Sequence, residues 1–123
     1  MTKKVLITDD SVFVRTMLKK ILVANGYEIV GEAKNGAEAI NLYKELSPDI
    51  VTMDITMPDM DGVQVVKKII EMDPTAIIVM CSAENNRAEI FNAIKAGAKE
   101  FIMKPFEEQQ VIDIFLRLKL EVR

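Results

Sequence analysis

The sequence predicts an α/β protein in which a doubly wound, five-stranded parallel sheet is covered by helices on both faces. Apolar, strand-like runs alternate along the chain with segments of helical spacing, and turn residues separate them. Strands that alternate with helices of about 10–15 residues indicate a parallel sheet. No linker, internal repeat or low-complexity tract interrupts the pattern, so residues 1–123 are expected to form one domain.

The first half of the chain predicts two strand–helix units. The apolar run at residues 5–8 is a strand, and Ser11 begins a helix that ends at Asn25 and Gly26. Residues 27–33 alternate only partly between apolar and polar, which predicts a weaker strand near an edge of the sheet. Asn35 opens a capping-box pattern for the next helix, which stops before Pro48.

The second half of the chain predicts three further units. Their strands are the apolar runs at residues 49–53, 76–81 and 101–103. The helices that follow are expected to begin near Asp61, Glu84 and Glu107. Asp61 and Gln64 repeat the capping pattern, Pro74 ends the first of these helices and Gly97 the second, and the last is expected to reach the C-terminus.

Composition and charge exclude several classes of function. The net charge of -3 gives no electrostatic basis for binding nucleic acid, and no apolar stretch approaches the roughly 20 residues that span a bilayer. The N-terminus has no secretory signal, so a cytoplasmic location is expected. The chain has no histidine, which excludes a histidine-dependent catalytic triad. Cys81 lies alone in an apolar run, which predicts a buried thiol.

Polar residues stand where four of the predicted strands end. Asp9 and Asp10 follow the first strand, Asp54 the third, Ser82 the fourth and Lys104 the fifth. Right-handed crossovers bring the carboxyl ends of parallel strands to one edge, where ligands bind. Like charges brought together repel unless a cation lies among them. The sequence therefore predicts a site for a divalent metal and a phosphoryl group.

These motifs, in this order and at this spacing, resemble the receiver domain of two-component response regulators. They are Asp9-Asp10, Asp54 within the segment 53–62, Ser82-Ala83 and Lys104-Pro105, and the resemblance covers essentially the whole chain. It implies the flavodoxin-like strand order 2-1-3-4-5. Because no output domain follows, the chain resembles a stand-alone receiver of the kind that serves chemotaxis.

The chemistry expected at the site is the formation of an acyl phosphate on Asp54. A carboxylate can attack phosphorus and carry the phosphoryl group, and Mg²⁺ is the hard, oxygen-binding cation suited to neutralise that group. Asp10 is expected to bind Mg²⁺ directly, Asp9 through water, and Asp54 as the shared ligand. The resemblance adds the carbonyl of Thr56 to this set.

The remaining site residues are expected to sense the phosphoryl group. Lys104 can pair with Asp54 before the reaction and with the phosphoryl group afterwards, and the Ser82 hydroxyl can donate to a phosphoryl oxygen. The resemblance implies that Phe101 is a switch aromatic and that Thr56 and Glu84 tune hydrolysis. Three plainer interpretations stay open: Asp10 and Ser82 as helix caps, and Phe101 as an ordinary core ring.

The resemblance also implies partners. The phosphodonor would be a sensor histidine kinase, the downstream target a protein such as a flagellar switch component, and a phosphatase is a further candidate. Such a protein catalyses only its own phosphorylation and dephosphorylation, so it is not expected to be an enzyme for other substrates.

The C-terminal helix carries more apolar positions than one core face needs. One stripe is expected to pack on the sheet and consists of Val111, Ile114, Phe115 and Leu118. The second stripe consists of Ile112, Leu116 and Leu120. The second stripe is either a partner surface that includes Phe101, a wider contact with the core, or part of a frayed terminus.

Two other classes of function compete. The first is a phosphohydrolase with an aspartyl-phosphate intermediate, as in haloacid-dehalogenase-like enzymes. These enzymes carry a second aspartate two residues after the nucleophile as the general acid, and this chain has Thr56 at that position. Flavodoxin-like electron carriers need a phosphate loop after the first strand, where Asp9 and Asp10 would repel a phosphate. Among receivers, a phosphorelay intermediate is the alternative to a chemotaxis output protein.

Overall fold

The computed structural model describes residues 2–83 and 86–119. Its five strands form one parallel sheet in the order β2-β1-β3-β4-β5, so the predicted fold and strand order are confirmed. The elements are β1 (Lys4–Thr8), α1 (Val12–Ala24), β2 (Glu28–Ala33), α2 (Gly36–Leu46), β3 (Ile50–Asp54), α3 (Gly62–Met72), β4 (Ile78–Ser82), α4 (Arg87–Ala96), β5 (Glu100–Met103) and α5 (Glu108–Lys119).

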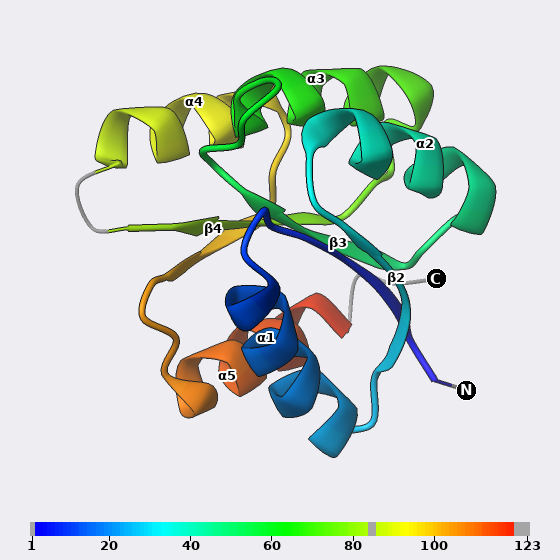
Figure 1. Ribbon diagram of the computed structural model, residues 1–123, viewed down its shortest axis with the longest axis vertical. Helices are drawn as coiled ribbons and strands as arrows, with labels where there is room; N and C mark the ends of the chain where they lie inside the picture. The colour runs from blue at the N-terminus through cyan, green and yellow to red at the C-terminus, as the bar shows by residue number, and fades with distance from the viewer. Residues whose placement is uncertain (1, 84–85, 120–123) are drawn as a thin grey trace.

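The sheet lies between two layers of helices. Helices α2, α3 and α4 cover one face, and α1 and α5 cover the other (Figure 1). Each face has its own cluster of buried apolar side chains, one against α2–α4 and one against α1 and α5. Strands β3 and β4 are buried along their whole length, whereas β2 is mostly half-buried or exposed. The weak alternation of β2 thus reflects its place at an edge.

Caps fix where most helices begin. The Asn35 side chain accepts the Glu38 N–H (2.9 Å), but Glu38 Oε1 accepts the N–H of Lys34 rather than that of Asn35, so only half of the predicted box forms. The box of Asp61 and Gln64 is complete. Helix α4 begins at Arg87, later than expected, because its first helical hydrogen bond is accepted by the carbonyl of Asn86.

Within the part of the chain that the structure describes, no helix combines the length and the apolar character that crossing a membrane requires. The helices instead bury one face against the sheet, as the two core clusters show.

Candidate functional site

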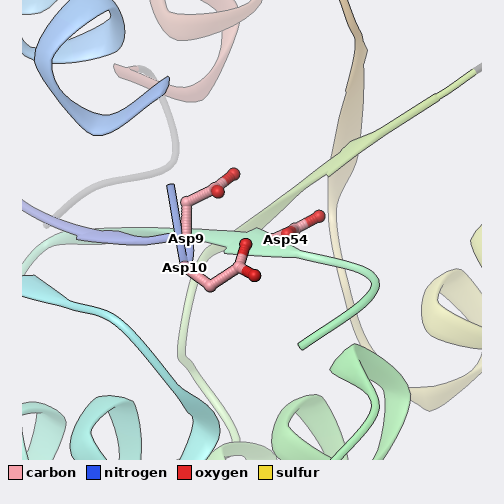
Figure 2. Close-up of side chains that lie close together, drawn as sticks. All are labelled: Asp9, Asp10 and Asp54. Carbon is pink, nitrogen blue, oxygen red and sulfur yellow. The ribbon is translucent and has the colours of Figure 1, made fainter. Parts of the chain in front are cut away.

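Three carboxylates meet where β1 and β3 end. One carboxylate oxygen from each of Asp9, Asp10 and Asp54 lies within 4.8 Å of the others. Figure 2 shows the three side chains side by side at the carboxyl edge of the sheet. Asp9 and Asp54 are buried, at 2% and 6% exposure, while Asp10 is exposed. The predicted convergence of strand ends therefore brings these acids together.

Lys104 follows β5 and bridges the two buried acids. Its Nζ lies 2.9 Å from Asp9 Oδ2 and 3.2 Å from Asp54 Oδ1. The contact with Asp54 is the one expected before phosphorylation, whereas the shorter contact with Asp9 was not foreseen. One ammonium group is thus shared between two of the three carboxylates in the cluster.

Burial and charge set the protonation of this cluster. Burial raises the pKa of Asp54, the negative charge of Asp9 raises it further, and Lys104 only partly offsets both. Burial alone would lower the pKa of Lys104, but its hydrogen bond to Asp9 and the charge of Asp54 outweigh that effect, and the net shift is upward. Lys104 is therefore firmly cationic, and the ionised form of Asp54 favours an additional cation.

Asp9 and Ser11 arrange the start of α1. Asp9 Oδ1 accepts the N–H of Ser11 (3.0 Å), and Ser11 Oγ accepts the N–H of Val14 (3.3 Å). Ser11 is the N-cap of α1, so the interpretation of Asp10 as a helix cap is wrong. The Asp9 carbonyl also accepts a hydrogen bond from Arg15 Nη1 (2.7 Å). No sequence pattern points to Arg15 beyond its position one helical turn after the cap.

Ser82 ends β4 and is 1% exposed. Its hydroxyl donates to the Ala83 carbonyl (3.0 Å), and its own carbonyl accepts the N–H of Lys104 (2.8 Å). Because the N-cap of α4 is Asn86, the interpretation of Ser82 as a helix cap is wrong. The backbone bond to Lys104 instead ties the end of β4 to the segment that follows β5.

Thr56 lies beside Asp54 in the loop between β3 and α3. Its N–H points to Asp54 Oδ1 at 3.4 Å. The loop closes where the Gly62 N–H donates to the Ile55 carbonyl (2.8 Å). A Cβ at Gly62 would lie 2.6 Å from the Asp54 carbonyl oxygen, so only glycine fits there. Glu84, the other residue expected to tune hydrolysis, lies outside the described residues.

The expected partner surface lies around β5 and α5. Phe101 is 39% exposed, so the interpretation of an ordinary core ring is wrong. It lines a pocket of about 360 Å³ together with Arg87, Ile90 and Met103. In the second stripe of α5, Leu116 is 54% exposed and Ile112 is half-buried. Leu120 lies outside the described residues.

Comparison with known proteins agrees with this geometry. A family model described as the response regulator receiver domain matches residues 5–116. The chemotaxis protein CheY of Thermotoga maritima is 56% identical over 113 residues, which is 92% of this chain and 94% of that protein. CheY of Bacillus subtilis is 53% identical over the same shares.

Solved structures give the same picture, and they do not favour a phosphohydrolase or an electron carrier. A chain in the CheX–CheY–BeF₃–Mg²⁺ complex from Borrelia burgdorferi has a TM-score of 0.90 and 38% identity, and the match covers 95% of this chain and 89% of that one. The receiver domain of Thermotoga maritima CheB has a TM-score of 0.86 and 33% identity, over 98% and 96%. This chain belongs to the response regulator receiver family and is closely similar to chemotaxis CheY proteins.

Proposed function

We propose that this receiver accepts a phosphoryl group from a sensor histidine kinase onto Asp54, with Mg²⁺ bound beside it, and that phosphorylation changes its affinity for a chemotaxis target. The observation that carries the proposal is the buried carboxylate of Asp54, which lies within 4.8 Å of two further carboxylates and 3.2 Å from Lys104 Nζ. The CheY proteins to which it is similar favour chemotaxis output over a phosphorelay role.

The donor set fits Mg²⁺. All three candidate ligands in the cluster are carboxylate oxygens, which a hard cation prefers over nitrogen or sulfur. Lys104 already occupies one oxygen of Asp9 and one of Asp54. Asp10 is exposed and is thus the acid best suited to direct coordination, with Asp9 acting through water and the Thr56 carbonyl completing the set. When bound, the cation would neutralise charge on the phosphoryl oxygens.

The transfer itself needs little from the protein beyond position and charge. An oxygen of Asp54 forms a bond to phosphorus while the P–N bond of the donor phosphohistidine breaks, and the donor imidazole keeps the electron pair and takes up a proton. Lys104 Nζ donates to the Asp54 carboxylate, and after the transfer it can donate to the negatively charged phosphoryl oxygens instead. The Ser82 hydroxyl, now bonded to the Ala83 carbonyl, can rotate to donate to one of them.

The switch would run from Ser82 to Phe101. Movement of Ser82 toward the phosphoryl group would be passed to the end of β5 through the Lys104 N–H to Ser82 carbonyl bond. The pocket lined by Ile90 and Met103 gives the exposed Phe101 ring a place to enter. A phosphoryl group that favours one ring position would change the surface offered to a partner.

Partners and setting follow from the same proposal. We expect one receiver domain that works in the cytoplasm, with a histidine kinase as donor and a flagellar switch component as one candidate target. A phosphatase is a further candidate, and the solved complex of CheX with a CheY that resembles this chain is an example of such a receiver bound to a second protein.

Asp54→Asn tests the proposal. Acetyl phosphate with Mg²⁺ should add one acid-stable, base-labile phosphoryl group to the wild-type protein and none to the variant, as intact mass spectrometry would show. Asp61→Asn is a matched control, because this carboxylate caps α3 and lies outside the cluster. Mapping of the phosphoryl group to Asp59 or Asp61 in the wild-type protein would refute the assignment.

A further inference from the structure

Asp59, in the loop between β3 and α3, binds the N-terminus of α2 through backbone hydrogen bonds. Its Oδ1 accepts the N–H of Gly36 (2.8 Å), and its Oδ2 accepts the N–H of Ala37 (2.9 Å). Oδ1 also accepts the N–H of Met60 (3.0 Å). Each carboxylate oxygen thus binds a different N–H of a helix that lies more than 20 residues earlier in the chain.

The contact is close as well as polar. A Cβ on Gly36 would lie 2.5 Å from Met60 Cγ and 2.8 Å from Val65 Cγ2, so the start of α2 packs directly on the loop and on α3. The N–H groups of the first turn of a helix have no partner inside the helix and carry partial positive charge. These hydrogen bonds lower the pKa of the Asp59 carboxyl, the bond from Gly36 most of all. Asp59 is therefore anionic at neutral pH.

The other end of the same loop reaches the phosphorylation site. The Gly62 N–H to Ile55 carbonyl bond closes the base of the loop, and the side chain of Met57 is buried. Thr56 lies between this base and Asp59, with its N–H directed at Asp54 Oδ1. The path of the backbone at Thr56 is thus fixed from both sides, at the base by the sheet and at the tip by Asp59.

We propose that Asp59 is a positioning residue for metal binding and phosphorylation, because it ties the loop to α2 and so holds the Thr56 backbone toward the cation and Asp54. The inference rests on the proposed function. We call the two hydrogen bonds from Gly36 and Ala37 to Asp59 the clamp. Without the clamp the loop would spend part of its time in conformations in which the Thr56 carbonyl does not point toward the cation. The apparent Kd for Mg²⁺ then rises in inverse proportion to the competent fraction of the loop.

The test compares Asp59→Ala with Asn35→Ala. Asn35 caps the same turn of α2 through the Glu38 N–H but is not part of the loop, so it controls for simple loss of helix capping. Both variants should melt at a lower temperature than the wild-type protein. Only Asp59→Ala should raise the Kd for Mg²⁺, measured by calorimetry on the unphosphorylated protein. We expect a rise of about tenfold, the lower end of the effect found for groups that orient metal ligands.

Two further measurements separate positioning from stability. Hydrogen exchange without Mg²⁺ should be faster at residues 56–61 in Asp59→Ala and unchanged there in Asn35→Ala. Asp59→Asn keeps one acceptor oxygen, so its Kd should lie between those of the wild-type protein and the alanine variant. An unchanged Kd in Asp59→Ala, or an equal rise in Asn35→Ala, would overturn the clamp alone. A wild-type protein that neither binds Mg²⁺ nor accepts phosphoryl groups would overturn the proposed function and this role with it.

Discussion

Replacement of Asp10 by asparagine should stabilise the protein when no metal is present. The carboxylates of Asp9, Asp10 and Asp54 lie within 4.8 Å of one another, and the contacts of Lys104 are with Asp9 and Asp54. Ser11 rather than Asp10 caps α1, so the charge of Asp10 is not needed to begin the helix. Asp10 therefore adds repulsion to the cluster that only a bound cation would relieve.

The size of the effect follows from this geometry. Two charges at about 5 Å repel by about 1 kcal/mol in a water-like dielectric, which suits an exposed side chain. Asp10 has two acidic neighbours, and Lys104 offsets part of their repulsion, which leaves a net cost of about 1 kcal/mol. For a domain of this size that corresponds to a rise in Tm of about 4 °C in Asp10→Asn.

Asp10→Asn should raise the Tm without metal but reduce the further rise in Tm that Mg²⁺ produces. With Mg²⁺ at roughly ten times its Kd, binding to the native state stabilises the wild-type protein by about 1.4 kcal/mol. If loss of the Asp10 carboxylate weakens binding about tenfold, the same Mg²⁺ concentration stabilises the variant by only about 0.4 kcal/mol. The variant should thus melt higher than the wild-type protein in EDTA and gain less from Mg²⁺.

Thermal melts of both proteins in EDTA and in Mg²⁺ decide the matter. Glu45→Gln is the control, because it removes one negative charge from the exposed surface of α2, outside the cluster. An equal rise in Tm for Glu45→Gln would mean that total charge, and not the cluster, is responsible. An Asp10→Asn protein that is less stable in EDTA and responds fully to Mg²⁺ would show that Asp10 is structural and that the metal binds elsewhere.

Two further predictions concern signalling. Lys104→Ala and Ser82→Ala should still be phosphorylated by acetyl phosphate, at similar or reduced rates, yet bind a phosphorylation-dependent partner more weakly; wild-type affinity of either phosphorylated variant would remove that residue from the switch. Leu116→Asp should weaken partner binding or self-association without preventing phosphorylation. Leu116 is an exposed apolar side chain of the second stripe of α5, next to half-buried Ile112, and a charge there would oppose an apolar contact. Unchanged binding of every such partner would count against this surface.

The fold could be predicted almost entirely from the sequence, because its signals are local. Each strand is a short apolar run, and each helix has apolar residues at helical spacing between turn residues. Parallel strands with right-handed crossovers then leave few arrangements, all with their carboxyl ends at one edge. The start of α4 was placed too early because Asn86 is an N-cap without a side-chain cap bond, so the sequence carries little sign of it.

The candidate site could be predicted as a set of residues but not as a set of contacts. Residue types at strand ends identify Asp9, Asp10, Asp54 and Lys104, but they do not say which acid the ammonium group prefers. The clamp of Asp59 on α2 was missed because a bond between residues that are 22 or 23 positions apart has no local pattern. An aspartate after a proline is also an ordinary turn residue.

The two adjacent acids illustrate how one sequence motif yields two physical roles. Asp9 and Asp10 both follow the end of β1, and both carboxylates lie in the cluster with Asp54 (Figure 2), but the two acids differ in burial and in partners. The buried Asp9 is held by Lys104 and by the N–H of Ser11, so its charge is already compensated inside the protein. Asp10 faces solvent with its charge still to be balanced. We therefore expect the two acids to differ in role, with Asp9 holding Lys104 and the start of α1 in place and Asp10 available to a cation.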